Sequence, residues 1–325
     1  MKSFRGARNS QMIRHDEKFA RLVMDFYAEK REQTAAMSIT SDARDVSINK
    51  VPQTAASALM GKLCFVVFSP DRMSLITGGA SERRRFVDAA ISQAYPRFAN
   101  ILSDFNKAIA QRNALVKRSV SVQQLRADVS IWDMTIAAAG AEIAKRRAEF
   151  IGSLSEIAQR IYAGISAERE QMRLRYNCSF CEIPTEESAQ LSKGDIMKQY
   201  LDRLAESVET DFNVRFTTKG PQRDDLEVTL DGRDIRSYGS QGQKRSAVLS
   251  LKLAEAEMLA RLIGEQPIAL LDDVMSELDA SRQEYLLNRL DGWQVMITCC
   301  DPAPLRLMDK GAVWMMDKGR LSREE

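Results

Sequence analysis

Two adjacent aspartates follow a short apolar run near the carboxyl-terminal end of the sequence, in "IALLDD" at residues 268–273. An apolar run of this length predicts a buried strand, and open α/β sheets bind their ligands at the carboxyl ends of strands. At such an end Asp272 could hold Mg²⁺ through water, and Asp273 could orient or deprotonate an attacking water. The alternative is that the pair only caps a helix near Ser276.

A polar, glycine-bearing loop, "SYGSQGQKRS" at 237–246, comes about 30 residues before the aspartates. Helical spacing predicts a helix from about Lys244, which places Ser240, Gln241 and Gly242 just before its amino terminus. Free backbone N–H groups and the helix dipole favour a phosphate at such a position. The loop is weak evidence alone, but together with a strand that ends in two aspartates it predicts a nucleotide site.

Strands and helices alternate around these groups, as the hydrophobic patterns indicate. The predicted strands are "GKLCFVVFSP" up to Pro70, "FNVRFTTKG", "LEVTLDG", "PIALL", "QVMITC" and "AVWMMDKGRL", the last turning at 317–319, and "ASRQEYLLNRL" is a predicted helix. From Arg85 to about Ala205 the pattern is helical and matches the size of a small domain. We therefore expect an α/β fold with a mostly parallel, covered central sheet, interrupted by a long α-helical arm domain.

Composition excludes some classes of protein. The 325 residues are 44% hydrophobic and 28% charged with a formal net charge of +2, so polyanion binding would have to rest on local basic patches. No run approaches 18 apolar residues, so we expect no membrane span.

Five cysteines without a signal peptide favour reduced thiols in the cytoplasm. Cys178-x-x-Cys181 could be half of a zinc site, but the single histidine, His15, is remote, and two partly buried thiols are the simpler interpretation.

One local excess of positive charge lies between residues 78 and 118, where eight basic residues stand against three acidic ones. Such a run is either a solvated helix face or a stripe that contacts nucleic-acid phosphates. Contacts of that kind would be indifferent to base sequence, and nothing in the chain resembles a base-reading module.

Several long segments resemble the RecF family of the ABC/SMC-type ATPase superfamily, in the same order and over essentially the whole chain. They are "SFRGARNSQMIR", "VVFSPDRMSLITGGASERRRFVDAAISQAYPRF", "QRNALVK", "GPQRDDLEV", "GSQGQKRSAVLSLKLAEAEML" and "LLDDVMSELDASRQEYLL". The resemblance implies an ABC-type ATPase head in two parts, residues 1–77 and 208–325, with the α-helical arm as residues 78–207 between them.

The resemblance also implies roles for single positions. Ser240, Gln241, Gly242 and Gln243 would be the signature motif, which reaches the γ-phosphate of ATP on the other subunit of a homodimer. Asp272 would be the Walker B ligand of Mg²⁺, and Asp273 would stand where the catalytic carboxylate lies. Residues 276–279, ending at Asp279, would be the D-loop at the dimer interface. Where ABC transporters have a histidine after the next strand, this chain has residues 298–301, "TCCD".

Family knowledge further implies double-stranded and gapped DNA as partners, bound by an ATP-dependent homodimer. RecR, and indirectly RecO and RecA, would be the protein partners in recombinational repair and the SOS response. The candidate DNA-binding residues are Arg83, Arg84, Arg85, Arg112 and Lys117, with Arg5, Arg8 and Arg14 as additional candidates.

No Walker A motif, G-x-x-x-x-G-K-[ST], occurs in the printed sequence; at its nearest match, Gly61-Lys62, Ala56 replaces the first glycine and Leu63 follows the lysine. We therefore expect a member of the family without its amino-terminal Walker A segment, with weak ATP binding, an exposed sheet edge and a tendency to aggregate. Two functions stay open. The first is an ATP-gated DNA clamp, since the family that the chain resembles is a weak, DNA-dependent ATPase. The second is a remnant that binds DNA or a partner independently of nucleotide. A metal-dependent nuclease is a third, less favoured alternative because no further acidic cluster accompanies the aspartates.

Overall fold

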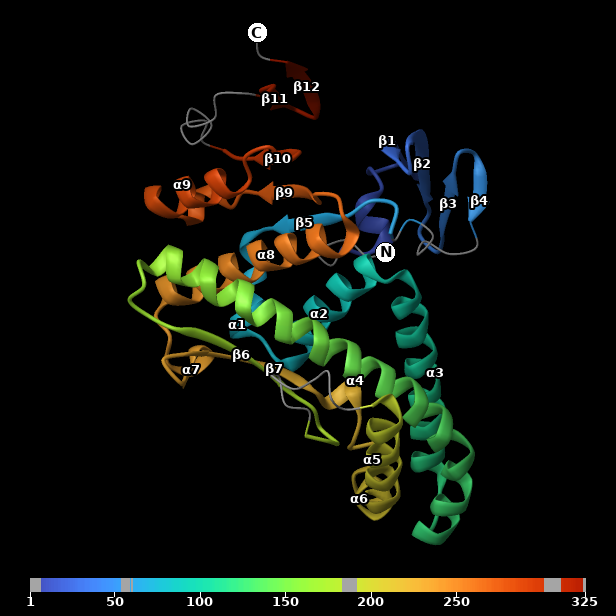
Figure 1. Ribbon diagram of the computed structural model, residues 1–325. Helices are drawn as coiled ribbons and strands as arrows, with labels where there is room; N and C mark the ends of the chain where they lie inside the picture. Colours follow the sequence, from blue (N-terminus) through green and yellow to red (C-terminus); the bar gives the residue numbers. More distant parts are fainter. Residues whose placement is uncertain (1–6, 54–58, 60, 183–191, 301–310, 324–325) are drawn as a thin grey trace.

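A three-stranded parallel sheet forms the part of the structure that carries the two aspartates (Figure 1). The computed structural model describes residues 7–53, 59, 61–182, 192–300 and 311–323. The sheet has the order β10-β9-β5, with strands β5 Phe65–Phe68, β9 Ile268–Asp272 and β10 Val295–Thr298. These strands confirm the predictions for "FVVF", "PIALL" and "QVMITC" and the expectation of an α/β fold with a parallel sheet.

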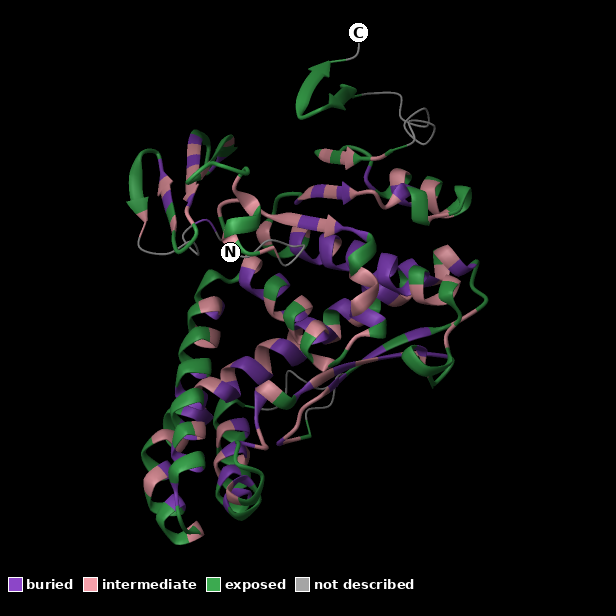
Figure 2. Cartoon of the chain, turned by 180° about the vertical axis from the view of Figure 1, so that it is seen from behind, coloured by how far each residue is buried: buried purple, intermediate pink, exposed green. Residues whose placement is uncertain are grey.

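Helix α8, Gln241–Ile263, lies between the parallel sheet and the long helix α4, Val122–Ser166 (Figure 1). It ends at Gly264 in the left-handed conformation, with φ of 80°, which an achiral residue adopts without strain. Val66, Phe68 and Leu271 belong to the same buried core as residues of α4 and α8. Figure 2 shows buried stretches both in the strands of this sheet and in the helices beneath it. The core therefore continues from the sheet into the helices.

The arm consists of helices that pack on α4 and extend away from the parallel sheet (Figure 1). They are α2 Ala80–Ala94, α3 Pro96–Arg118, α5 Lys193–Glu206 and α6 Val208–Val214. Pro96 begins α3, where its missing N–H costs no hydrogen bond, and Ser121 caps α4 by accepting from the Gln124 backbone N–H at 3.2 Å. Among the described helices, none is long and apolar enough to cross a membrane.

Two segments of the arm region differ from the sequence interpretation. "FNVRFTTKG" was predicted to be a strand, which is wrong for its first residues, because Phe212 to Val214 belong to helix α6. Within the segment predicted to be helical, β6 Met172–Asn177 is a strand whose alternate residues are buried, and it pairs antiparallel with β7 Asp225–Leu230. A short strand β8, Arg233–Asp234, completes that sheet. Helix α6 packs on the arm helices, although the predicted boundary at residue 207 would assign it to the ATPase head. That boundary stays a prediction.

An antiparallel meander precedes the parallel sheet, and sequence reasoning did not foresee it. Its strands are β1 Ala20–Ala28, β2 Arg31–Ile39, β3 Arg44–Ile48 and β4 Val51–Gln53, in the order β1-β2-β3-β4. The β1–β2 turn uses Glu29 and Lys30, both with positive φ, in place of the glycine that usually marks such a hairpin. Along β1 the side chains of Leu22, Val23 and Tyr27 are exposed. The open sheet edge expected without the Walker A segment, and the aggregation expected from it, stay predictions.

The remaining elements are short. They are the 3₁₀ turns η1 Asn9–Met12, η3 Pro70–Met73, η4 Pro221–Arg223 and η5 Met275–Glu277, the helices α1 Ser74–Thr77, α7 Ile235–Tyr238 and α9 Ala280–Arg289, and the hairpin β11 Trp314–Asp317 with β12 Arg320–Arg323. Helix α9 confirms the prediction for "ASRQEYLLNRL" to within one residue. The hairpin confirms the predicted turn, since Lys318 and Gly319 both have positive φ.

Candidate functional site

The carboxyl ends of β9 and β10 bring Asp272 beside Thr298. The two residues are partners in the parallel register, and Thr298 Oγ1 donates a hydrogen bond to Asp272 Oδ1 at 2.9 Å. The Asp273 backbone N–H lies 3.0 Å from Thr298 O and 3.2 Å from Thr298 Oγ1. Thr298 therefore holds both aspartates at the sheet edge, a role that sequence reasoning did not assign. The signal was its place at the end of the next strand of the sheet.

Asp273 has φ of 51°, in the left-handed region that few residues other than glycine and asparagine or aspartate occupy. Ser276 Oγ lies 2.9 Å from Asp273 O and 3.2 Å from Asp273 Oδ1, which steadies this turn. Strained backbone of this kind recurs at functional sites. Asp273 is partly exposed in this turn.

The alternative that the aspartates only cap a helix is wrong. The 3₁₀ turn η5 has Val274 as its N-cap and no side-chain cap, so neither aspartate caps it. Helix α9 is capped instead by Asp279, whose Oδ1 accepts from the Arg282 backbone N–H at 3.0 Å. Asp279 thus has a structural role in this chain in addition to its predicted place in the D-loop.

The predicted phosphate loop lies at the amino terminus of α8, with Ser240 as N-cap. Ser240 Oγ accepts from the Gln243 backbone N–H at 3.2 Å, and Gln243 Oε1 accepts from the Ser240 backbone N–H at 2.6 Å, a reciprocal capping box. The helix begins at Gln241, three residues before the predicted start. The first-turn N–H groups of Gln241 and Gly242 have no carbonyl one turn earlier to bind, so they point out of the helix end.

Glu170 fixes the orientation of the Gln243 side chain, which sequence reasoning did not foresee. Gln243 Nε2 donates to Glu170 Oε1 at 2.6 Å, and the Tyr162 hydroxyl donates to Glu170 Oε2 at 2.6 Å. Burial and the hydrogen bond to Glu170 raise the pKa of Tyr162, so its hydroxyl keeps its proton at neutral pH. Gln243 therefore supports the loop, while Ser240 and Gln241 remain exposed to solvent.

Two arginines connect residues 276–279, the predicted D-loop, to the first turns of α8. Arg245 Nη2 lies 2.5 Å from Glu277 Oε2, and Arg245 Nη1 donates to the Glu277 carbonyl at 3.1 Å. Arg282 pairs with the Asp279 carboxylate and donates from Nε to Ser246 Oγ at 2.9 Å. The predicted signature helix and the strand of the aspartates are thus connected through residues 276–279.

The donor set near Asp272 fits Mg²⁺ only as a partly hydrated ion. Within the described residues, no group of three or more histidine, cysteine, aspartate or glutamate side chains gathers to hold a metal. Mg²⁺ characteristically keeps several waters and binds through one or two carboxylates plus substrate phosphates, so one carboxylate next to a hydroxyl suits it. A two-metal nuclease centre needs more protein ligands, and this part of the chain offers no such cluster.

Two of the five residues predicted to bind DNA are buried in ion pairs, and for them the prediction is wrong. The Arg112 side chain is 0% exposed and lies 2.8 Å from Asp133 Oδ1 and 2.6 Å from Asp211 Oδ2. Arg83 binds both oxygens of Asp225, at 2.7 and 2.8 Å. Each arginine is already neutralised inside the protein, so neither can reach a phosphate.

The other three candidates differ in exposure. Arg85 is 71% exposed, and its one ion pair within the described part of the chain is with Glu82; Lys117 is exposed in the last turn of α3. Arg84 is half-buried and donates from Nη1 to the Asp224 carbonyl at 2.7 Å, and its burial lowers its pKa. Arg85 and Lys117 are therefore the stronger candidates for contact with DNA. Arg8 and Arg14 are exposed, while Arg5 lies outside the described residues.

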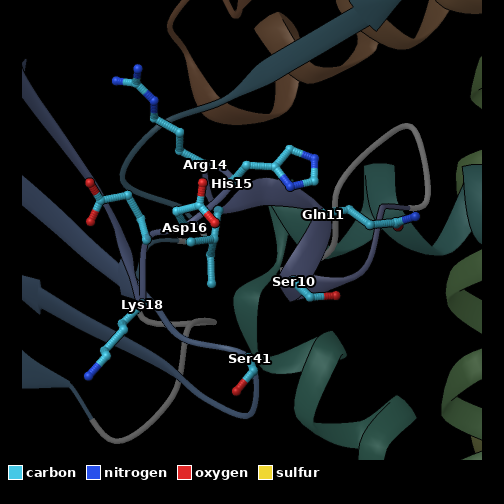
Figure 3. A pocket seen from close by; sticks show the side chains of 9 residues that line it. Ser10, Gln11, Arg14, His15, Asp16, Lys18 and Ser41 are labelled. Carbon is cyan, nitrogen blue, oxygen red and sulfur yellow. The ribbon is translucent and has the colours of Figure 1, made fainter.

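A shallow pocket of about 1020 Å³ surrounds Arg14 in the segment before β1 (Figure 3). Its lining residues are Ser10, Gln11, Ile13, Arg14, His15, Asp16, Glu17, Lys18 and Ser41. The labelled side chains of Arg14, Lys18 and Ser41 point in different directions and do not converge on one point (Figure 3). The pocket is therefore a weaker candidate for a nucleotide site than the end of the parallel sheet.

Comparisons with known proteins place these features in a context. No family model matches the chain. The chain is 39% identical over 299 residues to the DNA replication and repair protein RecF of Agathobacter rectalis, covering 92% of this chain and 78% of that protein. It is 36% identical over 324 residues to RecF of Alkaliphilus oremlandii, covering 98% of this chain and 86% of that protein.

Solved structures agree with the sequence comparison. The recombination mediator protein RecF with ATP, in the RecFOR pathway, superposes with a TM-score of 0.89 at 29% identity, over 99% of this chain and 86% of that one. An SMC head bound to the C-terminal winged-helix domain of ScpA has a TM-score of 0.51 at 14% identity, a likeness of fold alone.

Proposed function

Because the chain belongs to the RecF family of DNA replication and repair proteins, in the ABC/SMC-type ATPase superfamily, we propose that it binds double-stranded and gapped DNA without regard to base sequence. In this proposal it helps to load RecA at single-strand gaps during recombinational repair and the SOS response, in the cytoplasm. RecR is its direct protein partner, and RecO and RecA follow from that association.

The observation that carries the proposal is the arrangement at the end of the parallel sheet. Asp272 and Asp273 at the end of β9 and the Ser240-capped start of α8 are joined through the D-loop by Arg245 and Arg282. A structural relative with this fold is described as RecF with ATP. This supports ATP with Mg²⁺ as the ligand and a homodimer as the form that binds it.

In this proposal the two aspartates have different roles at the nucleotide site. Asp272 holds Mg²⁺, oriented by the hydrogen bond from Thr298. Asp273, which directly follows β9 and is partly exposed, orients or deprotonates the attacking water. Mg²⁺-ATP, when bound, would supply the phosphoryl group for hydrolysis, and Asp272 would be the residue of this chain that holds its metal.

The second subunit is approached through exposed groups in this proposal. Ser240, Gln241 and Gly242 offer N–H and hydroxyl donors at a helix amino terminus, which suits a γ-phosphate. Asp279 caps α9 beside them and would lie at the same interface. The exposed Arg85 and Lys117 contact DNA phosphates, and Arg84 is a weaker candidate.

A second candidate function is a DNA- or partner-binding protein that does not respond to nucleotide. The absence of a Walker A motif from the printed sequence favours it, because the backbone and lysine of that loop make most contacts to the β- and γ-phosphates in P-loop proteins. In this case the geometry at Asp272 would be retained without nucleotide binding.

DNA affinity measured with and without Mg²⁺-ATP separates the two candidates. We would titrate the intact chain into a fluorescent DNA duplex and compare it with Asp272→Asn, which removes a charged Mg²⁺ ligand. Tighter binding with Mg²⁺-ATP in the wild type, lost in the variant, supports the ATP-responsive protein. Equal affinity in all four conditions supports the second candidate in its DNA-binding form, and no binding in any of them contradicts DNA binding in both candidates.

A further inference from the structure

The Cys178-x-x-Cys181 motif places two thiols side by side in the loop that follows β6. The two Sγ atoms are 3.2 Å apart, and both side chains are partly buried. Neither cysteine belongs to the proposed nucleotide or DNA surfaces. Within the described residues no third metal ligand gathers beside the thiols, so their proximity does not indicate a metal site.

The two residues between the cysteines are anchored, and this holds the thiols together. The Ser179 backbone N–H donates to Asp224 Oδ1 at 2.8 Å, and the Ser179 hydroxyl lies 2.8 Å from Gly220 O and 3.0 Å from Gly220 N. The buried Phe180 ring stacks on Tyr200 of α5, with ring centroids 4.1 Å apart. A loop held at both middle residues keeps its end residues in place, so the thiols are preorganised and not merely near one another.

We propose that Cys178 and Cys181 form a reversible dithiol–disulfide site that is oxidised by a small-molecule disulfide of the glutathione class. The C-x-x-C spacing is that of dithiol redox motifs, and cytosolic disulfides are usually transient and redox-sensing. The inference does not depend on the proposed DNA-binding function.

The chemistry is two thiol–disulfide exchanges. The Cys181 thiolate attacks one sulfur of the oxidised glutathione, which forms a mixed disulfide and releases one glutathione thiolate. The Cys178 thiolate then attacks the Cys181 sulfur, which forms the Cys178–Cys181 bond and releases the second glutathione. The protein loses two protons and two electrons, and one glutathione disulfide becomes two glutathione thiols.

Burial raises the pKa of the Cys178 thiol, which favours Cys181 as the first attacker. The second exchange needs the Cys178 thiolate, so we expect closure of the bond to be slow at neutral pH and to accelerate as the pH rises. Asp224 also faces Cys178 and disfavours its negative charge, as does the neighbouring Cys181.

The bond would stiffen the junction between the β6–β7 sheet and the arm. The Asp224 carboxylate, which Ser179 holds, also accepts hydrogen bonds from Tyr176 of β6 and from Arg147 of α4, the latter at 3.3 Å. Arg147 in turn binds both oxygens of Asp88 on α2, at 2.8 and 2.9 Å. Closing the Cys178–Cys181 loop would therefore restrain the contact of Ser179 with Asp224. Asp224 is connected to β6 and α4, and through Arg147 of α4 to α2.

The test is incubation of the intact, reduced chain with oxidised and reduced glutathione at graded ratios, followed by acid quenching, alkylation and peptide mass mapping. We expect a peptide with Cys178 joined to Cys181, lighter by two hydrogens than the reduced peptide and restored by dithiothreitol. The wild type should unfold at a higher temperature when oxidised than when reduced.

Matched variants make the result specific. Cys178→Ser should trap glutathione on Cys181, Cys181→Ser should abolish the closed product, and Cys64→Ser, a cysteine outside the motif, should behave as the wild type. A stable glutathione adduct on wild-type Cys181 without closure, an intermolecular disulfide, or two unreacted thiols at high oxidised glutathione would each overturn the proposal. An unchanged unfolding temperature of the closed form would overturn the stiffening of the junction.

Discussion

At Asp273 the backbone adopts the left-handed conformation, with φ of 51°. For residues with a β-carbon this conformation costs roughly 1–2 kcal/mol, less for aspartate, and glycine adopts it freely. The Asp273 carboxylate accepts a hydrogen bond from Ser276 Oγ at 3.2 Å, whereas the contact with Thr298 is made by the Asp273 backbone N–H. Strained backbone recurs at functional sites, and this agrees with the role proposed for Asp273.

We expect Asp273→Gly to be more stable than Asp273→Ala by about 1 kcal/mol, because only the alanine keeps the strained β-carbon. Both variants lose the carboxylate, so the comparison isolates the backbone conformation. Urea denaturation of the two variants measures the difference. Equal stability, or a more stable alanine variant, would contradict the positive φ.

Arg112 illustrates how a charge excess in the sequence can be structural. Removing its guanidinium by Arg112→Met would leave Asp133 and Asp211 without their buried counter-charge. We expect the free energy of unfolding to fall by about 3–5 kcal/mol. Lys107→Met, which breaks the exposed pair with Asp104 on the same helix, should cost less than about 1 kcal/mol. Similar losses for both variants in urea denaturation would show that Arg112 is not buried.

Asp224 gives the stability a pH dependence. Burial raises its carboxyl pKa above the ordinary value of 3.8. A raised folded-state pKa contributes stability below the unfolded-state pKa, and this contribution is lost as the pH rises through the folded-state value. We therefore expect the stability of the wild type relative to Asp224→Asn to fall as the pH rises from about 4 towards neutrality. Thermal unfolding of both proteins across that range measures it, and a relative stability that grows with pH would contradict the raised pKa.

At the scale of elements, the packing of α4 against α5 depends on Gly140. A β-carbon at Gly140 would lie 2.4 Å from Cε1 of the buried Tyr200 ring. We expect Gly140→Ala to destabilise the protein by about 1–3 kcal/mol through this overlap. Gly194→Ala, in the exposed first turn of α5, meets only Ser192 Oγ at 3.5 Å and should stabilise by up to about 1 kcal/mol. Chemical denaturation compares the two, and a neutral Gly140→Ala would contradict the close approach of the helices.

The elements that sequence reasoning located have strong local signals. The β9 strand is an apolar run that ends in aspartates, and α8 starts at a serine followed by a glutamine three residues on. The meander was missed because its turns, such as Asn49-Lys50, contain no glycine although both residues have positive φ. Helix α6 was misread because three apolar residues in alternation fit a strand as well as a short helix.

The site residues that were predicted are likewise those with a local signal in the sequence. Asp272, Asp273 and Ser240 have neighbours in sequence that mark them, and their local positions were predicted. Thr298, Glu170 and Arg282 act through partners that are 26, 73 and 36 residues away, and no local pattern predicts such contacts. Arg112 was misassigned for the same reason, because its partner Asp211 is 99 residues distant.

At the scale of the whole molecule, the proposed DNA binding depends on which basic side chains are exposed and can contact phosphates. Arg83 and Arg112 are consumed in internal ion pairs, whereas Arg85 and Lys117 on α2 and α3 are exposed. A near-neutral chain with few exposed arm cations should bind DNA weakly, and its affinity should fall as salt rises, since each phosphate contact releases condensed counterions.

The central claim, sequence-independent DNA binding through the exposed arm cations, is tested by the affinity of the intact chain for two unrelated DNA duplexes at several salt concentrations. Equal affinity for both duplexes is expected, falling as salt rises. Arg85→Gln combined with Lys117→Gln should reduce the slope of log affinity against log salt by about 1 per lost contact, and Arg173→Gln on β6 should not change it. No binding at low salt, a strong preference for one duplex, or an unchanged slope in the double variant would contradict the account.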